Sequence, residues 1–130
     1  MSERVPTSQE FEACCREAFS LLLSRGFTLE PETEFSRRLR GRLFDVIVQG
    51  EGYGTIASVS LSDPRGRVPL SLLVPRSERR RPPSGQLAQI RFFAHQVLAH
   101  CTDLIEGRTE RLYQAHAEWE RISRAPARKR

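Results

Sequence analysis

A glycine-rich stretch, GEGYGT at residues 50–55, is the first place where this 130-residue sequence could do chemistry. Glycine-rich loops hold phosphate groups in kinases and nucleotide-binding folds, because their backbone amides approach the phosphate closely. Such sites also need a lysine on a nearby strand, or a helix that starts directly after the loop. The only lysine is Lys129, near the C-terminus, and the following TIASVSL alternates like a strand. We therefore predict a hairpin connection, in which Tyr53 is a contact residue and not a catalytic one.

Histidines and cysteines are the other side chains that could bind a metal or act as nucleophiles. His95 and His100 are five residues apart on a predicted helix, so they diverge by about 140° and cannot chelate as an i, i+4 pair would. Cys14, Cys15 and Cys101 are odd in number and lack CxxC spacing, which is not a disulfide framework. We predict buried free thiols, no metal and no cofactor. A nucleophile formed by Cys14 or Cys15 with His95 or His100 stays open as an alternative.

The carboxylates give no sign of an acid–base pair. Asp103 and Glu106 share a predicted helix face, as do the acids that follow them, and solvated helix surfaces routinely have this composition. We predict that the protein is not an enzyme.

Arginine clusters are the most prominent chemical feature of the chain. The formal net charge is +5, and it is uneven, with −2 on residues 1–62 and +7 on residues 63–130. This imbalance favours an acidic protein partner. The candidate partner-binding residues are Arg79, Arg80, Arg81, Arg38, Arg40 and Tyr53. The alternative is a nucleic-acid-associated accessory protein that uses the arginine-rich loop and the basic tail.

The apolar periodicity predicts three helices. Thr7 and Glu10 form a capping-box pattern before a helix over 8–25, and Gly26 would end it. After the basic, proline-containing loop at 75–85, an apolar stripe predicts a long helix over about 85–106, ended by Gly107. Thr109 would cap a last helix with its own stripe. That stripe consists of Leu112, Ala115, Trp119 and Ile122.

Between the first two helices, the sequence has strand signals. The segments 42–49, 53–61 and 67–74 are predicted strands, 34–40 is a candidate edge strand and 27–30 is marginal. Asp63, Pro64 and Gly66 predict a type I turn, and Pro69 suggests an edge position for the strand that follows. The predicted fold class is α+β: an N-terminal helix, an antiparallel meander of three or four strands, and two C-terminal helices packed on one sheet face.

The length of the chain predicts one domain over residues 1–122 and a basic flexible tail over 123–130. No segment has the length of apolar sequence that a membrane span requires, and the N-terminus lacks an apolar signal core. We therefore expect a cytoplasmic protein with no membrane partner.

The order of three segments resembles a known family. The helix ending LLLSRGF leads into the strands, VPLSLLV follows, and a long helix ends in LIEGRTERL. This arrangement is similar to small bacterial immunity-type proteins encoded beside polymorphic toxins, although Arg108 stands where they usually have an acid after the glycine. The resemblance implies a stoichiometric binding protein, an immunity or accessory subunit without catalytic residues.

Overall fold

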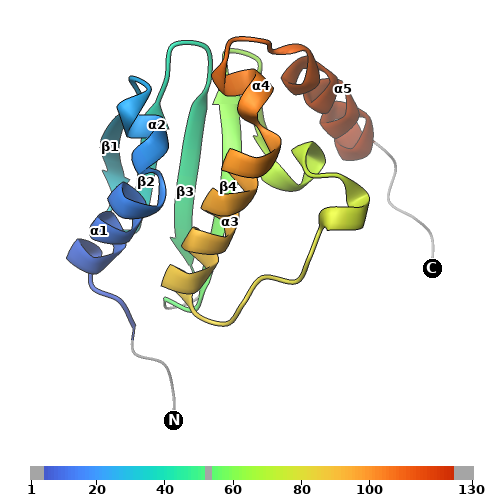
Figure 1. The fold of residues 1–130 in the computed structure, drawn as a ribbon. Coiled ribbons are helices and arrows are strands. Elements are labelled where there is room, and N and C mark those ends of the chain that lie inside the picture. Colours follow the sequence, from blue (N-terminus) through green and yellow to red (C-terminus); the bar gives the residue numbers. More distant parts are fainter. Residues whose placement is uncertain (1–4, 52–53, 125–130) are drawn as a thin grey trace, which may run out of the picture.

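The computed structural model describes residues 5–51 and 54–124, and these form an α+β fold with helices over an antiparallel sheet (Figure 1). The helices are α1 (Ser8–Ala18), α2 (Ser20–Ser24), α3 (Gln86–His100), α4 (Thr102–Ile105) and α5 (Glu110–Arg124). The strands are β1 (Thr28–Thr33), β2 (Ser36–Arg40), β3 (Asp45–Glu51), β4 (Ile56–Asp63) and β5 (Gly66–Pro69). None of the described helices has both the length and the apolar character needed to cross a membrane.

The sheet is a meander in the order β1-β2-β3-β4-β5, and every neighbouring pair is antiparallel. Its register places Leu39 beside Val46, Val46 beside Leu61, and Leu61 beside Val68. These side chains are buried in one core with residues of α1 and α3, such as Phe11 and Ile90. The helices therefore cover one face of the sheet, as Figure 1 shows. Arg38 and Arg40 of β2 alternate onto the other face, whereas Arg37 is buried on the helix side, where it contacts Glu12 of α1.

The first helix begins where the sequence predicts. Thr7 Oγ1 accepts a hydrogen bond from the Glu10 amide, and the Glu10 carboxylate accepts one from the Thr7 amide, which completes the capping box. The predicted continuous helix over 8–25 is interrupted at Phe19, and the helix predicted over 85–106 is interrupted at Cys101. Both residues are fully buried, and the apolar spacing continues across each interruption. Periodicity alone therefore did not reveal either break.

The described sheet has five strands where three or four were predicted, because the marginal 27–30 segment is part of β1. The 34–40 segment is not an edge strand, since β2 lies between β1 and β3. At the other side, β5 is an edge strand, as Pro69 indicates, but it ends at Pro69. Residues Leu70–Leu73 form a 3-10 helix, so the predicted strand over 67–74 was too long, and both Leu70 and Leu73 are buried.

The glycine-rich stretch connects β3 to β4 as a hairpin, with Glu51 paired to Ile56. Gly54 has a φ of 85°, which suits glycine in a tight turn. A β-carbon on Gly50 would lie 2.5 Å from Gln86 Nε2 and 3.2 Å from the Phe11 ring. The two described glycines thus serve the turn and the packing, which confirms the hairpin prediction. Tyr53 lies outside the described residues.

Candidate functional site

The first half of α5 is fixed to the rest of the protein. Leu112 and Ala115 are buried in the core. One Arg111 terminal nitrogen donates to His100 O at 2.7 Å and to Asp103 Oδ1 at 2.8 Å, and the other donates to Leu73 O at 2.6 Å. Arg111 therefore ties α5 to three separate segments of the fold.

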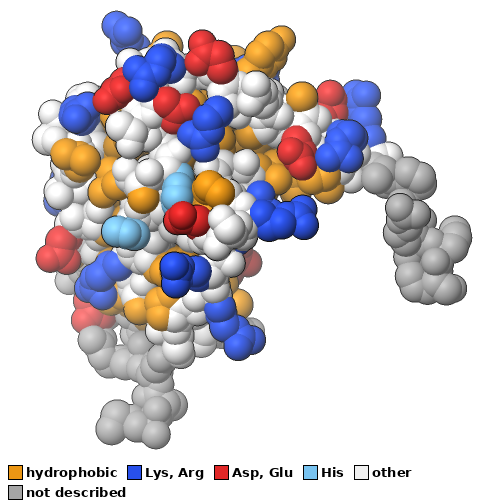
Figure 2. All heavy atoms as spheres, turned by 45° about the vertical axis from the view of Figure 1, so that its right-hand side comes forward, with side chains coloured by type: hydrophobic (Ala, Val, Ile, Leu, Met, Phe, Trp, Pro, Cys, Tyr) orange, Lys and Arg blue, Asp and Glu red, His pale blue; other side chains and the backbone are white. Residues whose placement is uncertain are grey.

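The second half of α5 continues the same apolar stripe without a covering partner among the described residues. On this stripe Trp119 is 38% exposed and Ile122 is 43% exposed, and Tyr113, which lies off the stripe in the first half of α5, is 65% exposed. Figure 1 shows α5 beside the sheet and away from the α1–α3 layer, and Figure 2 shows hydrophobic side chains at the surface of the projecting upper right-hand part of the molecule. The stripe was predicted to lie in the core over its whole length, and that prediction was wrong for its last two members.

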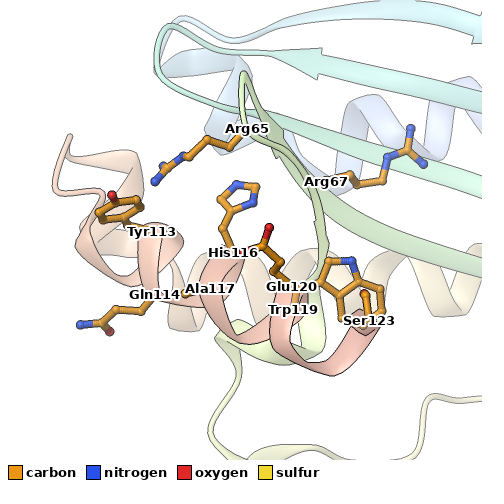
Figure 3. A pocket seen from close by; sticks show the side chains of 9 residues that line it. All are labelled: Arg65, Arg67, Tyr113, Gln114, His116, Ala117, Trp119, Glu120 and Ser123. Carbon is orange, nitrogen blue, oxygen red and sulfur yellow. The ribbon is translucent and has the colours of Figure 1, made fainter. Parts of the chain in front are cut away.

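A groove of about 710 Å³ lies between α5 and the β4–β5 hairpin, and we call it the α5 groove. Figure 3 shows its side chains: His116, Trp119 and Glu120 project from α5 toward the hairpin, and Arg65 reaches from the turn toward the Tyr113 ring. The lining residues are Arg65, Arg67, Tyr113, Gln114, His116, Ala117, Trp119, Glu120 and Ser123.

A polar network around Asp63 holds one wall of the α5 groove. The Asp63 carboxylate accepts hydrogen bonds from the Arg65 amide at 2.9 Å and from Arg65 Nη2 at 2.8 Å. The Arg65 guanidinium also stacks on the Tyr113 ring, 4.3 Å from its centroid. Burial would raise the pKa of Asp63, but the Arg65 hydrogen bonds and the nearby His116 hold it below its ordinary value. The ionised Asp63 carboxylate thus fixes Arg65, and the Arg65 guanidinium links the hairpin turn to Tyr113 of α5.

His116 joins the same network without completing a catalytic arrangement. Its Nε2 lies 2.8 Å from Asp63 Oδ1, yet the ring nitrogen is not aligned for a hydrogen bond with the carboxylate. Among the residues that line the groove, Ser123 has the side chain best suited to act as a nucleophile. It follows His116 by seven residues on α5, which is about 10 Å along the helix axis. That separation exceeds the reach of direct proton transfer between a nucleophile and its base. The groove is equipped to bind, through aromatic rings and cations.

The predicted residues Arg38 and Arg40 lie on the open sheet face and are paired with acids. Arg38 contacts Glu32 at 2.8 Å and Asp45 at 2.6 Å, while Arg40 contacts Glu30 at 3.0 Å. The register of β1 against β2 brings Glu30 and Glu32 alongside, and β3 contributes Asp45, so much of the arginine charge is compensated within the protein.

The predicted loop residues Arg79 and Arg80 line a separate pocket of about 300 Å³, which we call the loop pocket. Arg79 Nε donates to Val74 O at 2.9 Å, and Arg81 is exposed outside this lining. The structure therefore places the loop arginines and the β2 arginines in different pockets.

The cysteines and histidines do not form a reactive or metal-binding cluster in the described part of the chain. Cys14, Cys15 and Cys101 are buried, unpaired thiols. Burial raises the pKa of Cys15 and of Cys101 to about 12, and it also raises the pKa of Cys14. A thiol with such a pKa is protonated at neutral pH and is a poor nucleophile. Among the described residues, no three His, Cys, Asp or Glu side chains are grouped to hold a metal ion.

Sequence reasoning missed the residues of the α5 groove. Arg65 lies within the predicted turn and Arg67 follows it directly, but they were counted only in the net charge. Trp119 and Ile122 were assigned to the core by their spacing. The available signal was the polar composition of α5 after Ala115, where charged residues occupy most positions around these two apolar side chains.

Comparisons with protein-family models, with curated proteins and with solved structures found no match for this chain.

Proposed function

We propose that this protein is a non-enzymatic binding protein that holds an acidic partner protein in the α5 groove. The observation that carries the proposal is the exposure of Tyr113 and Trp119 beside the arginines of the β4–β5 hairpin, with Ile122 exposed on the same helix outside the groove lining. Tyrosine, tryptophan and arginine are the residue types that most often dominate binding energy at protein interfaces. An immunity or accessory subunit would work in this way, by covering a partner's surface in a stoichiometric complex.

The charges near the groove support an acidic partner. Arg67 makes only a long 3.5 Å contact with Gln49 Oε1, and no ion pair of Arg67 is found within the described residues. Arg67 lies close enough to Glu32 to lower the pKa of that carboxyl, but it forms no ion pair with it, so its guanidinium can still bind a partner's carboxylate, whereas Arg65 is already bound to Asp63. Complementary charge of this kind accelerates association and selects the partner, and the apolar side chains supply affinity.

Nucleic-acid binding is the second candidate, because aromatic rings and arginines also bind single strands. A nucleic-acid site needs basic side chains gathered on one face. Figure 2 shows Lys and Arg side chains interspersed with Asp and Glu over the face that it displays. This mixture of charges favours a protein partner.

Position-specific photo-crosslinking tests the proposal. A photoreactive phenylalanine analogue replaces Trp119 in one variant, and it replaces Leu21 in the control, since Leu21 is similarly exposed at 44% on α2. Cells of the native host are irradiated, and each adduct is identified by mass spectrometry. We expect an adduct with one acidic protein from position 119 and none from position 21.

Three outcomes would contradict the proposal. An adduct with nucleic acid at position 119 would support the second candidate, and an adduct with a second copy of this chain would identify the surface as a self-association interface. Equal labelling from positions 119 and 21 would show that the α5 groove has no specific partner.

A further inference from the structure

The loop pocket lies apart from the α5 groove and has a different chemistry. Its interior is built by Leu70 and Val74 from the segment after β5, and by Phe93 from α3. Ser58 and Val59 in β4 line one wall, and there β5 no longer pairs with β4, because their pairing runs only from Ser60 to Asp63. This local absence of a fifth strand leaves an apolar recess at the sheet edge.

Two arginines stand at this recess. Arg79 is held in place because its Nε donates to Val74 O at 2.9 Å, so its two terminal nitrogens are positioned beside the pocket. Within the described residues, neither Arg79 nor Arg80 has an ion pair, and no aspartate or glutamate lines the pocket. The neighbouring acid, Glu78, lies 3.4 Å from His100 Nε2. An apolar recess thus carries two uncompensated cations.

We infer that the loop pocket binds an apolar carboxylate, with the apolar group against Phe93, Leu70 and Val74 and the carboxylate at Arg79 and Arg80. The arginine fork matches a carboxylate geometrically and binds it through charge-assisted hydrogen bonds. The volume of about 300 Å³ is at the lower end for ligand sites, which suits a medium-length acyl chain or one aromatic side chain. The same chemistry occurs in a free fatty or aryl acid and in the C-terminal residue of a polypeptide.

The edge of β4 next to the pocket is already occupied, which argues against an added strand. The Ala57 amide donates to Gln89 Oε1 at 2.7 Å, and Gln86 Nε2 donates to Ile56 O at 2.9 Å. These two side chains satisfy backbone groups that an added strand would need. The carboxylate end of a ligand, and not a long backbone ladder, is therefore the recognised group.

Calorimetric and NMR titrations with defined probes test the inference. The probes are octanoate, a tetrapeptide ending in phenylalanine with a free carboxylate, and the neutral octanamide and amidated peptide. The variants are Arg79→Gln with Arg80→Gln, and the control Arg81→Gln, which alters the same loop outside the pocket lining. We expect an acid probe to bind wild type and Arg81→Gln with the same affinity. It should bind the double variant about ten-fold more weakly, and wild type should bind the neutral probes about ten-fold more weakly than the acids. The NMR shifts should centre on Phe93 and Val74.

The outcomes separate the two ligand sources. Binding of octanoate assigns the pocket to a small acid, and binding of the peptide acid alone assigns it to a polypeptide C-terminus. The inference is overturned if neither acid binds, if the neutral probes bind as well as the acids, or if the double variant binds as tightly as wild type. These measurements do not involve Trp119 or Ile122, so they test the loop pocket independently of the function proposed for the α5 groove.

Discussion

Gly50 is a glycine because its neighbours leave no room for a β-carbon. The added atom would meet Gln86 Nε2 at 2.5 Å and the Phe11 ring at 3.2 Å. We predict that Gly50→Ala lowers the free energy of unfolding by about 1–3 kcal/mol, the usual cost of overpacking. Urea denaturation measures this loss, and Gln49→Ala, on the exposed neighbouring residue, is the control.

The obstacle at Gly50 can be identified by a double variant. If Gln86 is the group that must move, Gly50→Ala should cost less in a Gln86→Ala background than in the wild-type background. Equal costs in both backgrounds would show that the close approach of Gln86 is not the reason for the glycine.

The cysteines lead to a second prediction at the residue scale. Because burial raises the pKa of Cys15 and Cys101 to about 12 and also raises that of Cys14, their thiolate forms are scarce at neutral pH. We expect an aromatic disulfide reagent to leave all three thiols unmodified in the folded protein and to modify all three in urea. Rapid modification of Cys14 or Cys15 in the folded protein would revive the Cys–His nucleophile alternative.

At the scale of elements, α5 depends on Arg111 for its position. That side chain bonds two backbone carbonyls and Asp103, from three segments. We predict that Arg111→Gln lowers the free energy of unfolding by about 1–2 kcal/mol and raises hydrogen exchange in α5 before exchange in the sheet. Arg108→Gln is the matched control, since the Arg108 side chain is exposed and pairs with Glu106. Uniform loosening of α5 and the sheet would show that Arg111 has no specific anchoring role.

The element scale also shows what the sequence could predict. Local signals sufficed for the start of α1 at the capping box, for the β3–β4 hairpin and for the turn at Pro64. They did not predict the breaks at Phe19 and Cys101, because buried spacing continues through both. They also did not predict that Arg38 and Arg40 would be paired, since their partners Glu30 and Glu32 lie on a strand whose register is set by tertiary pairing.

The same reasoning explains the incomplete prediction of the site. A periodic stripe predicts which helix face is apolar, but not how far the rest of the protein extends to cover it. The core ends at Ala115, so Trp119 and Ile122 continue the stripe into solvent. Their exposure follows from the shape of the fold and not from their own positions in the chain.

At the scale of the whole molecule, carboxylates paired with arginines contribute to the stability in acid. Hydrogen bonds from Arg16 and Arg37 lower the pKa of Glu12, and a hydrogen bond from Arg38 lowers that of Glu32. The pKa of Asp63 is also lowered, because the Arg65 hydrogen bonds outweigh its burial. A carboxylate with a lower pKa in the folded state stabilises the fold fully above its unfolded pKa and loses this effect as the pH falls through the folded value.

We therefore predict that the free energy of unfolding falls as the pH drops below the ordinary pKa values of the carboxyl groups, which are 4.5 for glutamate and 3.8 for aspartate. Urea denaturation at a series of pH values measures the slope. In the Asp63→Asn variant, the free energy of unfolding should change less steeply with pH in the most acid range. An unchanged slope in this variant would show that Asp63 does not contribute through its charge.

The central claim is that the exposed half of α5 holds a protein partner. Its most direct test is a titration of the crosslinked partner, once purified, with wild type, with Trp119→Ala/Ile122→Ala and with Leu21→Ala/Ile56→Ala. The control removes two side chains that are 44% and 51% exposed elsewhere on the surface. We expect the α5 variant to bind about 30-fold or more weakly, because each lost anchor costs more than about 1 kcal/mol, and we expect the control to bind like wild type. Equal affinity of the α5 variant and wild type would contradict the account.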